Sequence, residues 1–225
     1  EILIGLVGSE MCIRDRPRLE RHADLIVDAI EPREGVPLHV EIGCGKGAFA
    51  VGMAGLMPDV DYYALEKVPD VMVMAVEKAA AAELKNCKFL IADAVMLPDI
   101  CPAGSVDVLY LNFSDPWPKN RDRKRRLTHI NFLETYTKLL KPNGILSIKT
   151  DNVGLFDFTL EQLELAGFEM FDLTRDLHNS DIANEVMTEY EKRFSELGFP
   201  INAVKARIKI CLLYRSPSPR DRSVS

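Results

Sequence analysis

The sequence predicts an α/β protein in which a doubly wound, mostly parallel β-sheet carries helices on both faces. Segments with the pattern of short buried strands alternate with segments of helical character along most of the chain. One strand-like segment, residues 106–113, is almost continuously apolar, which is typical of a strand covered on both faces. The chain has no internal repeat and no low-complexity linker. These observations favour a single domain.

The first half of the chain predicts three strands and three helices. Leu19, Leu25, Ile26 and Ile30 form an apolar stripe that predicts a helix over residues 18–30, ended by the proline at position 32. The other elements follow from short apolar runs for strands and from stretches rich in Ala and Met for helices. They are a strand over 37–42, a helix over 47–57, a strand over 61–65, a helix over 71–84 and a strand over 87–92.

The second half continues the alternation. The strand over 106–113 precedes a helix over 133–140, and the sequence Lys-Pro-Asn-Gly at 141–144 predicts a turn into a strand over 145–150. Further along, helical spacing predicts helices over 156–166 and 185–197, and Phe199-Pro200 ends the second of them. An apolar run predicts a last strand over 201–210.

The two ends of the chain differ from the rest. Residues 6–16 and 211–221 have neither helical nor strand periodicity. Back-translation of LVGSEMCIRD gives a short DNA whose complementary strand, in another frame, encodes TSPSPRD, which the chain matches from Ser216 onward. We therefore expect residues 1–16 and 211–225 to be non-native tails derived from a sequencing adapter, with one natural domain over 17–210.

Composition narrows the class of protein. Five cysteines without a CxxC pair argue against a disulfide framework and a zinc knuckle, and the four histidines show no metal spacing, so no metal is expected. No apolar stretch reaches the roughly 20 residues that cross a bilayer. A reduced, cytoplasmic protein is the simplest interpretation. Because the net charge is −6, any contact with nucleic acid requires a local basic patch.

A glycine turn with an acidic residue before it ends the first predicted strand. This turn reads Glu41-Ile-Gly43-Cys-Gly45-Lys-Gly47, and glycines allow a ligand to approach the backbone closely. The spacing Gly43-x-Gly45-x-x-Ala48 also fits a dinucleotide fingerprint, with Glu66 at a suitable distance for a ribose hydroxyl. The turn alone therefore leaves a nucleotide cofactor open.

Three carboxylates at successive strand ends help to distinguish between the possible cofactors. Glu41, Glu66 and Asp93 end the first three predicted strands, so they would face one crevice. A carboxylate at the turn repels an anionic pyrophosphate. S-adenosyl-L-methionine instead offers an amine, a sulfonium, ribose hydroxyls and an adenine amino group, which suit carboxylate acceptors. This methyl donor is the favoured cofactor.

A rigid loop and a basic run follow the fourth predicted strand. Asp115 lies in Ser-Asp-Pro-Trp-Pro-Lys, where two prolines and the only tryptophan restrict the backbone. Six of the eight residues from Lys119 to Arg126 are basic. Such a run is usually a solvated face, but beside a methyl-transfer site it predicts a track for phosphates.

The segment LYLNFSDPWPKNRDRKRRL resembles the signature of the bacterial-type tRNA (guanine-N7)-methyltransferases. The resemblance extends over VEIGCGKG, the strand ends at Glu66 and Asp93, IKTDN at 148–152 and TEYE at 188–191. It covers residues 17–210 and implies one methyltransferase domain with a Rossmann-like S-adenosylmethionine-dependent fold. In this family the substrate is guanine 46 in the variable loop of tRNA.

The resemblance also implies roles for individual residues. It implies that the cofactor is contacted by Glu41, Gly43, Gly45, Gly47, Glu66, Asp93 and Asp115, and that Asp115 is also the catalytic residue. It implies that the substrate nucleoside is contacted by Lys119, Asp151, Thr188, Glu189, Tyr190 and Glu191. It implies that RNA is contacted by Arg121, Arg123, Lys124, Arg125 and Arg126. The expected partner is tRNA, without membrane or metal, and the protein is expected to be a monomer or a homodimer.

Two other functions remain open on the sequence. A nicotinamide-dependent oxidoreductase could use the same glycine turn, although no constellation for hydride transfer is evident. An RNA-binding or assembly protein could retain the fold without catalysis, although such a relic would be free to lose the acids. Calorimetry would distinguish a methyltransferase from such an oxidoreductase by showing which cofactor the protein binds.

Overall fold

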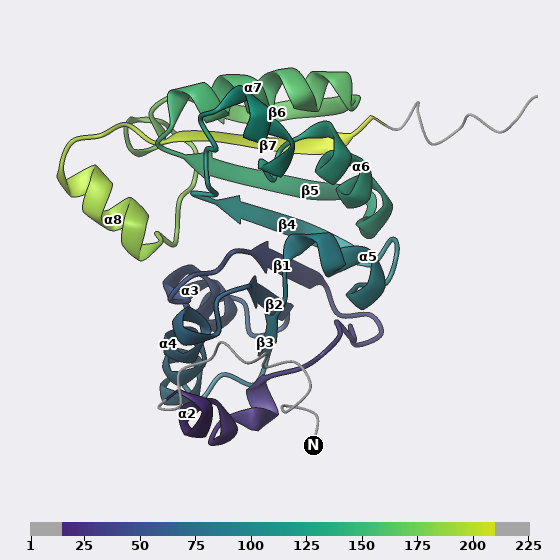
Figure 1. Ribbon diagram of the computed structural model, residues 1–225, viewed down its shortest axis with the longest axis vertical. Helices are drawn as coiled ribbons and strands as arrows, with labels where there is room; N and C mark the ends of the chain where they lie inside the picture. The colour runs from purple at the N-terminus through teal and green to yellow at the C-terminus, as the bar shows by residue number, and fades with distance from the viewer. Residues whose placement is uncertain (1–14, 210–225) are drawn as a thin grey trace, which may run out of the picture.

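A seven-stranded sheet forms the centre of the protein in the computed structural model, which describes residues 15–209 (Figure 1). The strand order is β3-β2-β1-β4-β5-β7-β6. Neighbouring strands are parallel except where β7 pairs with β5 and with β6 in antiparallel register. The order reverses between β1 and β4, which is where ligands bind in sheets of this type. The predicted doubly wound, mostly parallel sheet is confirmed.

The elements alternate along the chain much as the sequence predicts. The strands are β1 (Leu38–Ile42), β2 (Asp61–Glu66), β3 (Cys87–Ile91), β4 (Val106–Asn112), β5 (Leu140–Thr150), β6 (Phe168–Thr174) and β7 (Asn202–Ile208). The α-helices are α2 (Arg16–Glu20), α3 (Ala48–Leu56), α4 (Pro69–Ala81), α5 (Leu97–Ile100), α6 (Ile130–Leu139), α7 (Val153–Leu165) and α8 (Glu189–Glu196). Short 3₁₀ turns are η1 (Ala23–Leu25), η2 (Ala94–Met96), η3 (Asn120–Arg125) and η4 (Leu177–Asn179).

The sheet separates two hydrophobic cores because successive side chains of a strand point to opposite faces. In β1, Leu38, Val40 and Ile42 join the core that α5, α6 and α7 cover. The other core lies beneath α3 and α4, on the opposite face of the sheet (Figure 1). Glu41 alternates with the apolar residues of β1, so it faces the α3 side and is 1% exposed. A carboxylate is thus buried next to the switch point.

The predicted helix over 18–30 is wrong. Helix α2 ends at Glu20, η1 follows, and Ile26 then forms a parallel bridge with Phe89 of β3. The Val27 N–H donates to the Phe89 carbonyl at 2.9 Å. This extended segment covers the exposed edge of β3, which would otherwise offer unpaired backbone groups. The residues of the apolar stripe are therefore buried in different places, since Leu19 lies in α2, Ile26 lies against β3, and Ile30 belongs to the core on the other face of the sheet.

Two further differences occur in the second half. Strand β6 was not predicted, because at the sheet edge most of its side chains remain partly or fully exposed and its sequence lacks an apolar run. Helix α8 begins at Glu189 instead of 185, where the Thr188 hydroxyl accepts the Glu191 N–H at 2.9 Å and caps the helix. The segment before it is irregular.

The predicted tails lie almost entirely outside the described residues, which begin at Asp15 and end at position 209. Asp15 and Arg16 lie inside them, at the start of α2, and Asp15 accepts a hydrogen bond from Arg18 at 2.7 Å. Within the described part of the chain, every helix is too short or too polar to cross a bilayer.

Candidate active site

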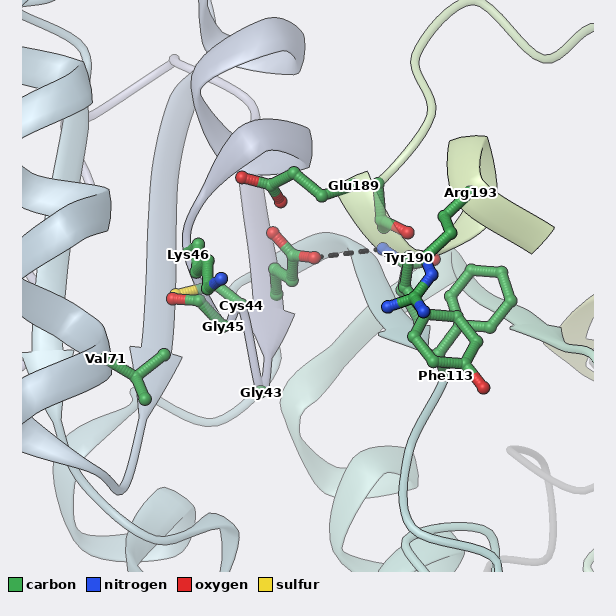
Figure 2. A pocket seen from close by; sticks show the side chains of 12 residues that line it. Gly43, Cys44, Gly45, Lys46, Val71, Phe113, Glu189, Tyr190 and Arg193 are labelled. Carbon is green, nitrogen blue, oxygen red and sulfur yellow. Dashed lines mark hydrogen bonds between the residues drawn. The ribbon is translucent and has the colours of Figure 1, made fainter. Parts of the chain in front are cut away.

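Two cavities adjoin at the carboxyl ends of β1 and β4. The first, of about 480 Å³, lies between the glycine turn after β1 and helix α8 (Figure 2). The second, of about 540 Å³, lies beyond the ends of β2 and β3 and is closed by the loop after β4. Gly43, Asn112 and Phe113 line both cavities. Together they form a cleft at the topological switch point, the position that the fold predicts.

Glu41 places a buried carboxyl group in the wall of the first cavity. Its oxygens accept hydrogen bonds from the Asn112 amide at 3.0 Å and from the Tyr62 hydroxyl at 3.4 Å. Burial raises the pKa of Glu41 from 4.5 to about 7, although both hydrogen bonds favour the charged form. The Oδ1 atom of Asn112 is buried and has no partner among the described residues. The wall thus offers two acceptors to a ligand that carries hydrogen-bond donors or positive charge.

The glycine turn leads from β1 into α3. Gly43 and Gly45 have φ values of +76° and +55°, and a side chain at either would extend into open space next to the cavity. The Gly45 N–H donates to Glu66 at 3.1 Å, which ties the turn to the end of β2. Gly47 differs, because a Cβ there would lie 2.5 Å from that of Ala75. Gly47 lines neither cavity and permits α3 to pack against α4, and its cofactor contact stays a prediction.

The other predicted acids line the second cavity. Glu66, Asp93 and Asp115 approach it from β2, from the turn after β3 and from the loop after β4. Glu66 accepts N–H groups from Gly45 and Val68, and Asp93 accepts the Val95 N–H at 3.1 Å. Asp115 is exposed and has no hydrogen bond or ion pair within residues 15–209. The acids therefore face one continuous cleft but not one cavity, since Glu41 lies in the other.

The loop after β4 has unusual backbone angles. Phe113 has φ +53° and Trp117 has φ +40°, values that non-glycine residues rarely adopt. The ring of Phe113 lies 5.0 Å from the ring of Tyr190. Strained residues of this kind persist only where the surrounding structure fixes them, and they cluster at functional sites. Asp115 lies between the two strained positions.

The basic run after this loop does not form one uniform surface. Lys119, Arg121, Arg123, Lys124 and Arg125 are exposed. Lys124 and Arg125 line the second cavity, and the Arg125 guanidinium lies 3.7 Å from the centre of the Trp117 ring. Arg126 is only 9% exposed, and its guanidinium donates to the carbonyls of Pro116 and Trp117. The Nε and Nη2 donors of Arg126 are therefore engaged inside the protein, and its RNA contact stays a prediction.

Helix α8 forms the opposite wall of the first cavity. Thr188, Glu189 and Tyr190 line it, as does Arg193 (Figure 2). Glu189 forms an ion pair with Lys78 of α4. The Tyr190 hydroxyl donates to Asp151 at 3.3 Å. Asp151 itself lines neither cavity and reaches the site through this tyrosine.

Glu191 is completely buried and does not line either cavity. Its carboxylate accepts hydrogen bonds from Lys149 of β5 at 2.8 Å and from Asn184 at 2.7 Å. Lys149 also donates to the Asn184 side chain and to the Val186 carbonyl. One oxygen thus anchors α8 to β5 and the other bonds to the segment before α8, and the substrate contact by Glu191 stays a prediction.

Sequence reasoning missed several residues of the cleft. Asn112, Phe113 and Arg193 line the first cavity, and Lys149 holds its α8 wall. Asn112 and Lys149 pair in the register of β4 and β5, on the face that Glu41 shares. A polar residue at the end of a buried strand was a signal, but its meaning required the order of the strands. In residues 15–209, no group of three or more His, Cys, Asp or Glu could hold a metal ion.

Comparisons with known proteins give consistent results. The family described as "Putative methyltransferase" matches residues 36–204. A tRNA (guanine-N(7)-)-methyltransferase of Lachnoclostridium phytofermentans is 47% identical over 171 residues, which are 76% of this chain and 80% of that protein. A tRNA (guanine-N(7)-)-methyltransferase of Lactococcus lactis is 44% identical over 173 residues, with the same coverage of the two chains.

The fold is also similar to that of solved methyltransferases. The crystal structure of precorrin-6y C5,15-methyltransferase from Geobacter metallireducens matches with a TM-score of 0.55. The match covers 90% of this chain and 92% of the other, at 14% sequence identity. At this identity the likeness concerns the fold alone.

Proposed function

Because the chain belongs to the family of tRNA (guanine-N(7)-)-methyltransferases, we propose that it methylates N7 of a guanine in tRNA. The target is guanine 46 of the variable loop, as in the family that the motifs resemble. The observation that carries the proposal for the site is the cleft at the switch point, where Glu41 and Asn112 line the first cavity and the buried Oδ1 of Asn112 has no partner among the described residues. The product is 7-methylguanosine.

The residues of the cleft fit S-adenosyl-L-methionine as the cofactor. When bound, this cofactor supplies a methyl group on a positively charged sulfur. Glu41, Glu66, Asp93 and Asp115 would hold it as acceptors for its amine, hydroxyl and amino groups. The unpartnered Oδ1 of Asn112 adds one more acceptor. An anionic dinucleotide would bring its pyrophosphate near the Glu41 carboxylate, so the site does not favour the nicotinamide alternative.

Methylation of guanine N7 requires little acid–base catalysis by the protein. Guanine N7 carries a lone pair and no proton, so no base is required to generate the nucleophile. The main contribution is to align N7 with the methyl carbon and the sulfur. The base gains positive charge as the bond forms, and the Asp115 carboxylate, which has no partner within residues 15–209, would stabilise it.

The walls of the first cavity would receive the nucleoside. Thr188, Glu189 and Tyr190 line it from α8, and Tyr190 connects to Asp151. Carboxylates at this wall would accept the N1–H and the amino group of guanine. This acidic protein carries a local basic surface that would contact tRNA phosphates. Its residues are Lys119, Arg121, Arg123, Lys124 and Arg125. We place the protein in the cytoplasm, where its substrate occurs.

A pair of tRNA transcripts tests the function. Residues 17–210 or the full chain would be incubated with S-adenosylmethionine that carries a labelled methyl group. We expect label as 7-methylguanosine in the unmodified transcript and none when adenine replaces guanine 46. Equal labelling of both transcripts would show that another position is methylated. If a folded protein that binds the cofactor labels neither transcript, the proposal that tRNA is the substrate would be overturned.

A further inference from the structure

Arg126 is the one member of the basic run that turns inward. Its Nε donates to the Pro116 carbonyl at 2.9 Å, and its Nη2 donates to the Trp117 carbonyl at 3.1 Å. The guanidinium also lies 4.4 Å from the centre of the Phe158 ring on α7. Arg126 thus connects two successive carbonyls of the loop after β4 to a helix that packs in the core.

This connection meets a structural requirement of the loop. Proline at position 116 has no N–H, and Trp117 has a φ value of +40°, so the loop forms few regular backbone hydrogen bonds of its own. A planar guanidinium presents several N–H donors in a fixed fork, whereas a lysine ammonium is a compact point charge. Stacking on an aromatic ring further fixes the plane of the fork. The side chain is therefore suited to hold this loop in one conformation.

The residue next to the two carbonyls is Asp115, which lines the second cavity. A carboxylate on an exposed loop keeps a fixed place only if the backbone that follows it is fixed. We propose that Arg126 is a positioning residue, which clamps the carbonyls of Pro116 and Trp117 and thereby sets the place of Asp115 in the cleft. This inference rests on the proposed function, in which Asp115 faces the reacting atoms.

The clamp divides the basic run into two parts. The exposed side chains before Arg126 remain available for RNA, and Arg125 stacks on the Trp117 ring at the rim of the cavity. Arg126 acts inside the protein. Replacement of Arg126 should therefore reduce turnover without changing the number of phosphate contacts, whereas replacement of exposed Arg121 should change the phosphate contacts.

Trp117 gives a direct readout, since it is the only tryptophan of the chain. We would compare Arg126→Lys and Arg126→Met with wild type by acrylamide quenching of tryptophan fluorescence, kcat, KM for tRNA and the salt dependence of tRNA binding. Arg175→Lys is the control, because Arg175 also lies over a phenylalanine ring of α7, 5.3 Å from the centre of Phe156, but donates to Asp157 instead of to the loop. Arg121→Ala provides the contrasting phosphate variant.

We expect both Arg126 variants to show increased quenching and kcat lowered about tenfold or more, because a displacement near 1 Å can cost a hundredfold in rate. KM for tRNA and the salt slope should stay at wild-type values, and Arg175→Lys should behave as wild type. Unchanged quenching and kcat would overturn the clamp. So would a lowered salt slope in Arg126→Met, since that result makes Arg126 a phosphate contact.

The clamp and the proposed function can fail separately. If the wild-type protein leaves the tRNA transcript unmethylated, the proposed function is overturned, while the quenching comparison still decides whether Arg126 holds the loop. Phe158→Leu is a second, milder variant in case Arg126→Met does not fold. It removes the ring that orients the guanidinium and should increase quenching in the same direction.

Discussion

At the scale of single residues, Glu41 is a carboxyl group in an unfavourable, buried position. It is 1% exposed, and burial raises its pKa to about 7. An ionised carboxyl group in such a place is costly unless it is paired. The cavity next to it and the free oxygen of Asn112 offer the place where a positively charged ligand group would supply that pairing. Ionisation of buried Glu41 thus costs stability, and a cation bound in the cavity would offset that cost.

Replacing Glu41 by glutamine should separate these two effects. The folded protein holds the carboxyl proton more tightly than the unfolded chain, so the wild type loses stability as pH rises from about 4.5 through about 7. Glu41→Gln removes this loss, and we expect it to be more stable than wild type at pH 8 by about 3 kcal/mol. Urea unfolding at pH 5 and pH 8 measures the difference.

The same variant should bind the cofactor less well. Loss of a charge-assisted hydrogen bond typically costs about 1.5–3 kcal/mol, so we expect affinity for S-adenosylmethionine to fall at least tenfold in calorimetry. Unchanged affinity at pH 8 would contradict the place of Glu41 in the cofactor site. A stability difference that is equal at pH 5 and pH 8 would show that the carboxyl group is not the cause.

Asp115 should act on the reaction more than on binding. It is exposed on its loop and has no hydrogen bond or ion pair within residues 15–209, so Asp115→Asn leaves the fold in place. We expect the variant to lose turnover by about a hundredfold, because a preorganised charge is removed from the developing cation. Single-turnover assays and calorimetry give rate and cofactor affinity separately. Methylation at the wild-type rate would refute the catalytic role.

At the scale of elements, helix α8 depends on one buried ionic contact. Lys149 and Glu191 are 8% and 0% exposed at their side chains, and Asn184 bonds to both. Such a pair contributes little net stability, but loss of one partner leaves an unpaired buried charge. Because α8 forms a wall of the first cavity, this contact places the residues that would receive the nucleoside.

Breaking the contact should loosen α8. We expect Glu191→Gln to lower the free energy of unfolding by about 3–5 kcal/mol, since it leaves the Lys149 charge buried. Asp157→Asn is the control, because it breaks an ion pair with Arg175 in which both side chains are 52% exposed, and it should cost about 1 kcal/mol or less. Equal losses in the two variants, measured by urea unfolding, would contradict the anchoring role.

The exposed part of the basic run predicts a salt effect. Each phosphate contact releases counterions from the nucleic acid, so the slope of log affinity against log salt reflects the number of contacts. We expect neutralisation of Arg121, Arg123 and Lys124 to flatten this slope by about two units for tRNA. Binding titrations at four salt concentrations measure it. An unchanged slope would show that these residues form a solvated face and make no contact with phosphates.

At the scale of the whole molecule, strand periodicity predicted the sheet and the ends of its first strands well. Glycine turns and acids at strand ends depend on local sequence, and the structure places Glu41, Glu66 and Asp93 along one cleft. The extended segment that covers β3 could not be predicted, because its apolar spacing fits a helix equally well. Edge strand β6 gave no apolar run to detect.

The direction of a side chain was also outside what the sequence could show. Arg125 and Arg126 are adjacent and chemically identical, yet one lines the cavity and the other is buried against Phe158. Glu189 and Glu191 differ in the same way, since one lines the cavity and the other anchors the helix. A motif identifies the residues of such a segment, but the role of each residue follows from its burial and its hydrogen bonds.

We propose that the cleft presents a methyl group to N7 of guanine in tRNA. The most direct test compares two transcripts that differ at one atom, with guanosine or 7-deazaguanosine at the target position. Single-turnover transfer of a labelled methyl group should occur with guanosine and be absent with 7-deazaguanosine, which lacks the N7 lone pair. Equal transfer to both transcripts would contradict the account.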